Sequence, residues 1–355
     1  MTDNLTVKKP IRILLCGLGV WGRQWLENIR KNGNYKLAGV VVSNSDALNR
    51  AKATNLTDEE CFTDITEAIE STKPDAVAVV VSPHRHGEII RVAMKKGVHV
   101  LSEKPLAKDI DEAREFMSLH KRHPHVRFIV SQNYRGRDCI ATMKKMIEDG
   151  AIGEVGYFIY SHQQTVKIPG YRLEMPSPVL DDMSIHHFDL MRYLTKQDFA
   201  EIYANENTVS WSWFQGKPLL NSFIKMTGCV SGVYSASWAA TGKIGEWNGN
   251  IQVFGSNGCV ELTDHAKVVL HKKRDVNEQL LGSYQPGQEV TQIALAYCEL
   301  QYVLENFKNA LTKKEKCETD IEDNIKSFLA VLAAKESIMQ NRPVAITSLN
   351  VPLGT

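Results

Sequence analysis

A run in the second half of the sequence combines carboxylates with histidines. Asp182, His186 and Asp189 are spaced i, i+4 and i+7 within Leu180–Leu194, a spacing that places all three on one face of a helix. A histidine with a carboxylate one turn earlier can act as a general base, because the carboxylate orients the ring and stabilises its cation. The alternative is that Asp182 caps the helix and His186 is a buried, hydrogen-bonded histidine. Both interpretations fit this run of residues.

A second candidate is the lysine of Glu103-Lys104-Pro105, which follows the apolar run Val98–Leu101. If that run is a strand of a parallel sheet, Lys104 emerges at the carboxyl edge, where such sheets bind ligands. A lysine there can donate a hydrogen bond to a substrate hydroxyl or carbonyl, and its charge can lower the pKa of a neighbouring acid. Taken alone, a lysine before proline is usually a surface turn. Glu103 is expected to be a cofactor-side or structural partner.

The third candidate is a glycine loop, G-x-G-x-x-G, at Gly17–Gly22. It follows a predicted strand, Ile11–Cys16, and opens a predicted helix, Val20–Arg30, which is the context that a dinucleotide-binding loop requires. The first glycine permits the tight turn, the second lets the backbone approach a pyrophosphate, and the third lets helix and strand pack closely. The cofactor-binding residues predicted here are Gly17, Gly19, Val20, Trp21 and Gly22.

The residues that end the second strand bear on the choice between NAD and NADP. An acidic residue about twenty positions after the loop usually bonds the ribose 2′-OH of NAD, but Ser43 and Asn44 stand here and no carboxylate comes before Asp46. Small neutral side chains tolerate a 2′-phosphate, and Arg23 or Arg50 could pair with it. The sequence therefore favours NADP slightly over NAD.

The loop after the fourth predicted strand, Ala76–Val81, should also line the cofactor site. Ser82, Pro83 and His86 lie in it, and His84 or His86 could contact nicotinamide or ribose. The alternative is that one of these histidines only caps the helix or bonds the loop. No third ligand is spaced to complete a metal site with this pair, so no metal is expected.

These candidates depend on two kinds of structure. Up to Asn133 the sequence alternates apolar strands with helices, which indicates βαβ units and a doubly wound parallel sheet, a Rossmann domain. After Asn133 most segments read as consecutive strands, which indicates an α+β domain with an open, mainly antiparallel sheet. Two helices, Thr291–Leu311 and Ile321–Gln340, close the chain, and Thr319 or Asp320 can cap the second. We expect domains at 1–133 and 134–355.

The composition excludes several classes of protein. The 355 residues are 43% apolar, and 42 Lys and Arg against 41 Asp and Glu leave a net charge of +1, so no nucleic-acid partner is expected. No apolar run approaches the ~20 residues that cross a bilayer, and Met1–Lys9 lacks the apolar core of a secretion signal. Seven cysteines without C-x-x-C spacing are expected to be reduced thiols. A cytoplasmic protein without a membrane partner is expected.

Taken together, these motifs resemble the Gfo/Idh/MocA oxidoreductases, the group of glucose–fructose oxidoreductase and inositol dehydrogenase. The resemblance rests on the glycine loop, Glu103-Lys104-Pro105 and the Asp182/His186/Asp189 helix, in that order. Asn133-Tyr134-Arg135 and Gly153-Glu154-Val155 are further local matches. It covers essentially the whole chain.

The resemblance implies an NAD(P)-dependent dehydrogenase or reductase that acts on a CH–OH group of a sugar or cyclic polyol. Lys104 would hydrogen-bond the reacting substrate, His186 would take the hydroxyl proton, and Asp182 would assist His186. A homo-oligomer, dimer or tetramer, built on the open sheet is also implied. The alternatives are a non-catalytic dinucleotide-binding regulator and a dehydrogenase for an anhydrosugar, an amino sugar or a dihydrodiol. Further candidates for the substrate pocket are His162, Tyr171, Arg172 and Trp238, each of which could instead serve the fold or an interface. Arg135 could reach the substrate or hold the domain junction.

Overall fold

The structure, a computed structural model, describes residues 9–43, 47, 49, 55–274, 286–313 and 316–351. By its contacts the chain divides into two compact units, Met1–Asn133 with Glu299–Ile325, and Tyr134–Cys298 with Lys326–Leu353. Asn44, Arg50 and most of the helix expected over 47–53 lie outside the described residues.

The first unit is built on a six-stranded parallel sheet in the order β3-β2-β1-β4-β5-β6. Its strands are β1 (Ile11–Cys16), β2 (Tyr35–Val41), β3 (Cys61–Phe62), β4 (Ala76–Val79), β5 (His99–Ser102) and β6 (Phe128–Val130). The central strand β4 is wholly buried, because a parallel sheet is covered on both faces and its strands read as continuous apolar runs. The expected doubly wound sheet is confirmed.

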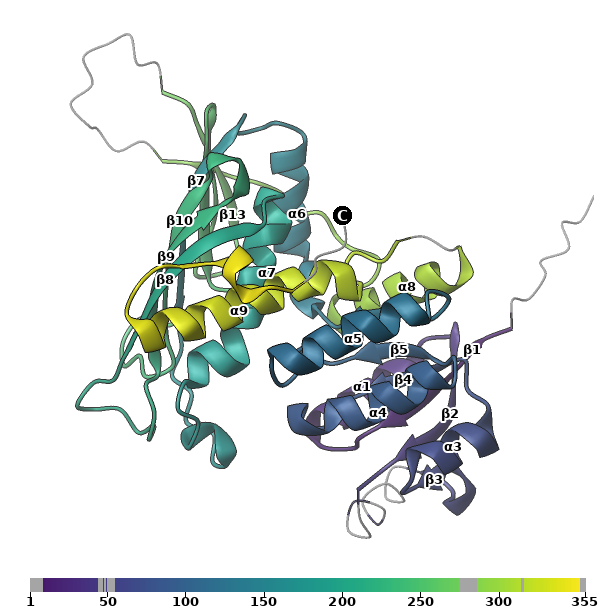
Figure 1. The fold of residues 1–355 in the computed structure, drawn as a ribbon. Coiled ribbons are helices and arrows are strands. Elements are labelled where there is room, and N and C mark those ends of the chain that lie inside the picture. Colours follow the sequence, from purple (N-terminus) through teal and green to yellow (C-terminus); the bar gives the residue numbers. More distant parts are fainter. Residues whose placement is uncertain are drawn as a thin grey trace, which may run out of the picture. The chain divides into compact units, whose positions relative to one another are not determined.

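Helices cover both faces of this sheet (Figure 1). They are α1 (Val20–Lys31), α3 (Ile65–Thr72), α4 (Pro83–Lys95), α5 (Ile110–Arg122) and α8 (Glu299–Thr312). Helix α1 packs with α8, whereas α3, α4 and α5 pack in succession. Apolar side chains of α1 and α8, such as Trp25 and Phe307, share one buried cluster with alternate residues of the strands, such as Ile13 and Ala78.

Helix α8 corrects two expectations. The expected domain 134–355 included it, but α8 belongs to the first unit because it completes the cluster around Trp25. The helix also begins at Glu299, not at Thr291. The preceding residues lie along helix α6 (Asp138–Glu148), where the backbone N–H groups of Ile293 and Leu295 donate to the side chains of Thr142 and Asp138.

The second unit contains a nine-stranded sheet in the order β14-β13-β12-β11-β7-β10-β9-β8-β15. Its longer strands are β7 (Val155–Gln163), β8 (Phe199–Asn207), β9 (Leu219–Met226), β10 (Ser231–Ser237), β11 (Asn250–Gly255), β12 (Gly258–Leu262) and β13 (Val268–Lys272); β14 (Gln288–Glu289) and β15 (Val344–Ala345) are short. Only the β7–β10 pair is parallel among these described strands, so the expected open, mainly antiparallel sheet is confirmed.

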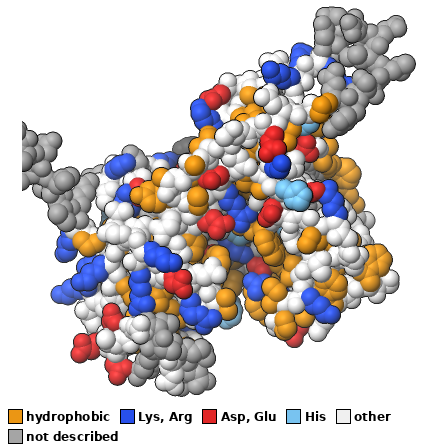
Figure 2. All heavy atoms as spheres, turned by 180° about the vertical axis from the view of Figure 1, so that it is seen from behind, with side chains coloured by type: hydrophobic (Ala, Val, Ile, Leu, Met, Phe, Trp, Pro, Cys, Tyr) orange, Lys and Arg blue, Asp and Glu red, His pale blue; other side chains and the backbone are white. Residues whose placement is uncertain are grey.

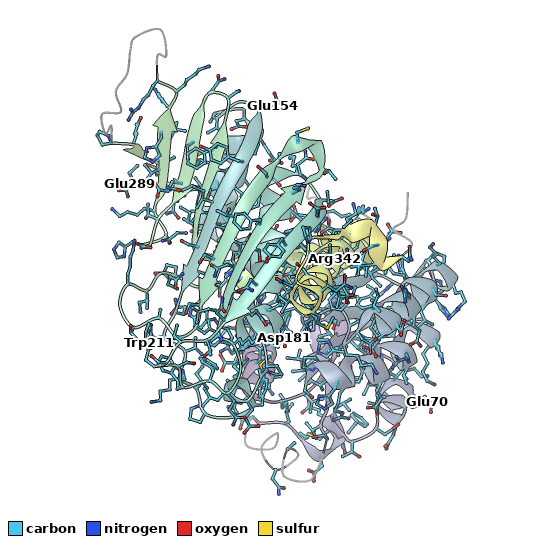
Figure 3. The ribbon with its side chains drawn as sticks, turned by 60° about the vertical axis from the view of Figure 1, so that its left-hand side comes forward. Glu70, Glu154, Asp181, Trp211, Glu289 and Arg342 are labelled. Carbon is cyan, nitrogen blue, oxygen red and sulfur yellow. The ribbon has the colours of Figure 1, made fainter. Side chains whose placement is uncertain are left out.

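One face of this sheet is buried and the other is open (Figure 3). Along β7, Phe158, Tyr160 and His162 are buried, while the alternating Tyr157 and Ile159 are exposed. This period of two is the pattern of a sheet with one covered face. The helices of the unit are α6 (Asp138–Glu148), α7 (Ser184–Thr195) and most of α9 (Ile321–Gln340), whose residues up to Ile325 are counted with the first unit. The Asp320 carboxylate caps α9 by accepting a hydrogen bond from the N–H of Asp323 at 2.8 Å, as expected.

The surface carries charges of both signs. Acidic and basic side chains are interspersed on the face drawn in Figure 2, in agreement with the balanced composition. Within the described part of the chain, no helix has the length and apolar character needed to span a membrane.

Candidate active site

The glycine loop has the geometry that its sequence predicts. Gly17 has φ +105°, and a Cβ there would collide with the carbonyl oxygen of Val80. A Cβ at Gly22 would collide with the carbonyl oxygen of Gly17. A Cβ at Gly19 would meet no described atom within 4 Å. Two of the glycines are therefore required by packing, whereas Gly19 faces open space.

The N-terminus of α1 is open to an anion. Gly19 is its N-cap and supplies no side-chain cap, and this helix, which is described throughout, has no acidic residue in its first turn. The first N–H groups of a helix have no partner within it and carry a partial positive charge. The exposed Val20 and Trp21 stand in this turn. The backbone N–H groups at this helix end, next to a glycine without a side chain, suit the pyrophosphate of a dinucleotide.

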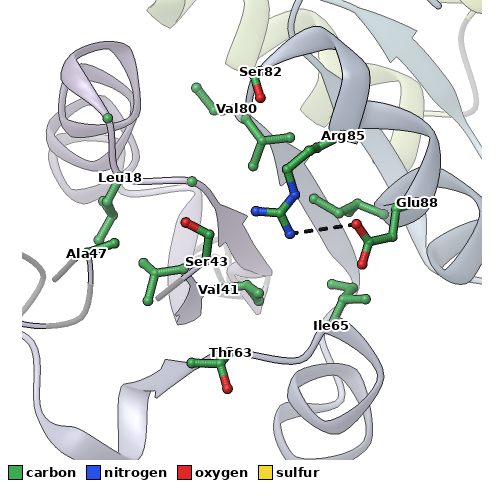
Figure 4. A pocket seen from close by; sticks show the side chains of 15 residues that line it. Leu18, Val41, Ser43, Ala47, Thr63, Ile65, Val80, Ser82, Arg85 and Glu88 are labelled. Carbon is green, nitrogen blue, oxygen red and sulfur yellow. Dashed lines mark ion pairs between the residues drawn. The ribbon is translucent and has the colours of Figure 1, made fainter. Parts of the chain in front are cut away.

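A cavity of about 300 Å³ lies at the carboxyl ends of β1, β2 and β4 (Figure 4). Gly17 and Gly19 form one wall, Ser43 and Thr63 contribute from the β2 side, and Ser82 begins the wall formed by α4. Parallel sheets bind nucleotides at this position, next to the glycine loop. Ser43 and Ser82 are exposed and line this cavity, whereas Pro83 is exposed at the start of α4 but is not among the lining residues.

Two charged residues of this cavity were missed from the sequence. Arg85 and Glu88 of α4 line it, with Arg85 Nη2 3.6 Å from Glu88 Oε2. Their position in the first turns of the helix after β4 could have indicated them, because that end of the helix faces the same edge of the sheet.

Glu103 lies beneath the glycine-loop helix. Its Oε1 accepts hydrogen bonds from the indole N–H groups of Trp21 and Trp25, both at 2.8 Å, and its Oε2 accepts from the backbone N–H of Lys104 at 3.2 Å. Burial raises the pKa of this carboxyl, and the indole donors oppose the rise. Both carboxylate oxygens of Glu103 thus accept hydrogen bonds within the first unit. This favours a structural role for Glu103 over a contact with the cofactor.

His86 is also held inside the first unit. It is buried, with Nδ1 3.2 Å from the carbonyl oxygen of Pro105 and Nε2 3.1 Å from that of Val81. Burial lowers its pKa. The ring therefore joins the loops after β4 and β5, which is the alternative role that the sequence left open. Lys104, in the second of these loops, is half-buried and precedes a cis peptide bond to Pro105.

In the second unit, the helix expected from Leu180 begins with a π-helical turn, Val179–Met183, and continues as α7. Such turns occur often at functional sites. Asp182 lies in the π turn, and its Oδ2 accepts a hydrogen bond from Arg172 Nε at 2.6 Å. The Arg172 guanidinium also lies 5.0 Å from the ring centre of the exposed Tyr171. Asp182 is thus paired with Arg172, which the sequence analysis named only as a candidate for the substrate pocket or the fold.

His186 and Asp189 of α7 both contact the segment Asn133–Gly136. The imidazole of His186 stacks on Tyr134, with ring centroids 4.5 Å apart. Asp189 accepts hydrogen bonds from Arg135 Nε at 2.7 Å and Nη2 at 2.8 Å, and both side chains are buried. Because Arg135 is engaged in a buried ion pair, the geometry favours a structural role for it over a substrate contact, the two roles that the sequence left open.

His187, next to the candidate base, is wholly buried. Its Nδ1 lies 2.8 Å from the Tyr234 hydroxyl and its Nε2 lies 2.9 Å from the carbonyl oxygen of Trp247, and burial lowers its pKa. His162 packs against it with ring centroids 4.6 Å apart. Burial, opposed by the backbone of Glu246, lowers the pKa of His162 to about 4.

His162 and Trp238 were both candidates for the substrate pocket. Both are buried, and neither His162 nitrogen nor the Trp238 indole nitrogen has a hydrogen bond of ordinary geometry with described residues. Trp238 packs near Phe214. Residue type alone therefore does not identify a substrate-pocket residue, because a polar aromatic side chain can pack in a core or line a pocket.

Comparisons with known proteins identify the family of both domains. Residues 11–132 match the oxidoreductase family with an NAD-binding Rossmann fold, and residues 140–261 match the GFO/IDH/MocA C-terminal domain. The chain is 24% identical over 349 residues to myo-inositol 2-dehydrogenase of Thermotoga maritima, covering 95% of this chain and 98% of the relative. It is 29% identical over 196 residues to 1,5-anhydro-D-fructose reductase of Ensifer adhaerens, covering 54% and 58%.

Solved structures share the fold. An oxidoreductase from Agrobacterium radiobacter in complex with NAD+, L-tartaric acid and magnesium superposes with a TM-score of 0.84 at 18% identity, covering 96% of this chain and all of the other. The apo scyllo-inositol dehydrogenase of Lactobacillus casei gives a TM-score of 0.76 at 21% identity, covering 96% and 99%. From its two matching domains, its glycine loop and its fold, the chain belongs to the GFO/IDH/MocA family of NAD-binding oxidoreductases.

Proposed function

We propose that this protein transfers a hydride between a nicotinamide dinucleotide and a carbinol carbon of a sugar or cyclic polyol. The observation that carries the proposal is the uncovered N-terminus of α1 beside a cavity at the carboxyl edge of the sheet. Relatives named myo-inositol 2-dehydrogenase, levoglucosan dehydrogenase and D-apiose dehydrogenase support a polyhydroxylated substrate. The domain 1–133 would bind the dinucleotide, and most of 134–355 would bind substrate.

The catalytic residues of the proposal are Lys104, Asp182 and His186. When bound, the nicotinamide accepts or supplies the hydride at the carbinol carbon. Lys104 donates a hydrogen bond to the oxygen on that carbon and stabilises the charge that develops there. An imidazole nitrogen of His186 takes the hydroxyl proton as the C–OH becomes C=O, and returns it in the reverse direction. Asp182, held by Arg172 in the turn before α7, would orient or assist His186.

The choice of cofactor follows from the end of β2. Ser43 is exposed there and lines the cavity, and a neutral hydroxyl admits a 2′-phosphate that a carboxylate would repel. The proposal is therefore NADP in preference to NAD. Cytoplasmic location is proposed with it, from the cysteine pattern.

The open face of the second sheet supports a homo-oligomer, a dimer or a tetramer. Tyr157, Phe223 and Val233 are exposed on it and line an apolar groove of about 660 Å³. Exposed apolar area of this kind marks interaction surfaces. Light scattering of the wild type and of Phe223→Asp tests this part, and a monomeric wild type would contradict it.

The test of the function is an absorbance assay at the reduced-nicotinamide band, with NAD and NADP in parallel and a panel of inositols, aldoses and anhydrosugars. Turnover of a polyol or sugar supports the proposal and identifies the cofactor. Tight nucleotide binding without turnover across the panel would support the non-catalytic regulator instead.

A further inference from the structure

Arg85 is the one cation among the described residues that line the cavity. It belongs to the first turn of α4, and its side chain projects into the cavity on the side of Ser43 and Val41 (Figure 4). Ser43 directly follows the residues that end β2, the place from which dinucleotide-binding sheets contact the ribose 2′ position. A guanidinium and a neutral hydroxyl thus face the same space.

The guanidinium is only loosely held. Its ion-pair partner, Glu88 Oε2, is 3.6 Å away, beyond the range of a good hydrogen bond, and the side chains of Arg85 and Glu88 are 34% and 62% exposed. An exposed pair of this kind contributes little to stability. A phosphate, by contrast, can accept two parallel N–H bonds from a guanidinium, and such charge-assisted bonds are stronger. Arg85 can therefore exchange Glu88 for a phosphate at small cost.

We propose that Arg85 binds the 2′-phosphate of the adenosine ribose and so makes the protein selective for NADP. The assignment rests on the proposed dinucleotide site. Glu88 limits the selectivity, because its charge competes for the guanidinium and repels the phosphate. The arginines named from the sequence are weaker candidates: Arg23 is exposed on α1 and is not among the lining residues, and Arg50 lies outside the described residues.

The experiment measures nucleotide binding directly, by calorimetry with the full chain and with NADPH and NADH as ligands. Arg85→Met should weaken NADPH binding by about tenfold or more while NADH binding changes less than about threefold, because only the 2′-phosphate is lost as a partner. Arg85→Lys should recover part of the loss, because it restores charge but not the planar fork. Glu88→Gln should tighten NADPH binding and leave NADH binding unchanged.

Matched variants and competitors separate the possible failures. Arg23→Met and Arg50→Met should leave the NADPH-to-NADH ratio unchanged, and 2′,5′-ADP should compete better than 5′-AMP in the wild type but not in Arg85→Met. Equal losses for both nucleotides in Arg85→Met, or a ratio controlled by Arg50, would overturn the assignment but leave the dinucleotide site standing. A wild type that prefers NADH also overturns it, and one that binds neither nucleotide overturns the proposed function as well.

Discussion

The imidazole of His186 lies nearly parallel to the phenol ring of Tyr134, with an angle of 17° between the planes and 4.5 Å between the centroids. The guanidinium of Arg137 lies 3.7 Å from the centre of the same phenol ring and donates a hydrogen bond to Asn248 at 2.8 Å. Two groups this close to one ring centre must occupy opposite faces of it. Arg137 therefore holds one face of the Tyr134 ring, and the other face of that ring fixes the plane of the His186 imidazole.

This stack predicts that Tyr134 is a positioning residue. Tyr134→Leu should lower kcat about 10- to 100-fold, because a base that loses its orientation reaches the reactive geometry less often. The affinity for nucleotide should not change. Tyr134→Phe keeps the ring and should retain most of kcat, so that rescue by phenylalanine identifies the stack as the cause. A Phe variant as slow as the Leu variant would assign the role to the hydroxyl instead.

The proposed catalytic lysine gives a second prediction. Lys104→Met should remove most of kcat, since one well-placed donor to a developing oxyanion contributes about 10²- to 10³-fold, while nucleotide affinity measured by calorimetry should be nearly unchanged. Lys108→Met is the matched control, because Lys108 is half exposed and is paired loosely with Asp109. Normal turnover in Lys104→Met would remove the lysine from the mechanism.

Glu103 should contribute to stability through its two indole donors. Glu103→Leu leaves the wholly buried Trp25 N–H without its acceptor, which should lower the free energy of unfolding by about 1–3 kcal/mol. Glu103→Gln keeps an acceptor oxygen and should cost less. Urea denaturation of the wild type, Glu103→Leu and Glu103→Gln measures the loss in the free energy of unfolding for each variant. If the two substitutions were equally harmless to stability yet weakened nucleotide binding, Glu103 would be a cofactor contact.

The buried pair of Arg135 and Asp189 predicts a larger effect. Asp189→Asn or Arg135→Met leaves one buried charge without its partner, and each should lower the free energy of unfolding by about 3–5 kcal/mol. The exposed ion pair of Arg114 and Asp111 is the control. Asp111→Asn should change the free energy of unfolding by less than about 1 kcal/mol. A stable Arg135→Met protein with a raised substrate KM would restore the substrate-binding role.

The depressed pKa of His162 predicts a loss of stability on acidification. The pKa of about 4 in the folded protein lies below the ordinary value of 6.5. Between these two pH values the histidine is protonated in the unfolded chain but neutral in the folded protein. Stability should therefore fall as the pH drops from about 6.5 to about 4, by about 3 kcal/mol from this one ring. His187 adds a fall of the same sign.

The measurement is urea denaturation at several pH values, compared between wild type and His162→Phe. The variant should show a shallower decline across this interval, whatever its absolute stability. His265→Phe is the control, because His265 is exposed in the turn between β12 and β13, and the variant should keep the wild-type slope. Parallel slopes for wild type and His162→Phe would show that His162 is not the group that titrates.

The sequence determined what depends on residues close together in the chain. The glycine loop, its strand and its helix were predicted because Gly17 and Gly22 act within a few residues of one another, and the Asp320 cap was predicted for the same reason. The change from βαβ units to consecutive strands near Asn133 follows from the hydrophobic period, which is also local. Family membership was predicted from three such motifs in order.

Only the tertiary structure decided which distant residues meet. Four contacts could not be predicted from residue spacing, because the partners belong to different elements. They are Arg172 with Asp182, Tyr134 with His186, Arg135 with Asp189, and Arg85 with the cavity. Helix α8 packs on α1 although nearly 270 residues separate them, as the bond between Gln301 and Asn28 shows. Spacing fixes the face on which a side chain stands, whereas the packing of the whole chain fixes what lies opposite.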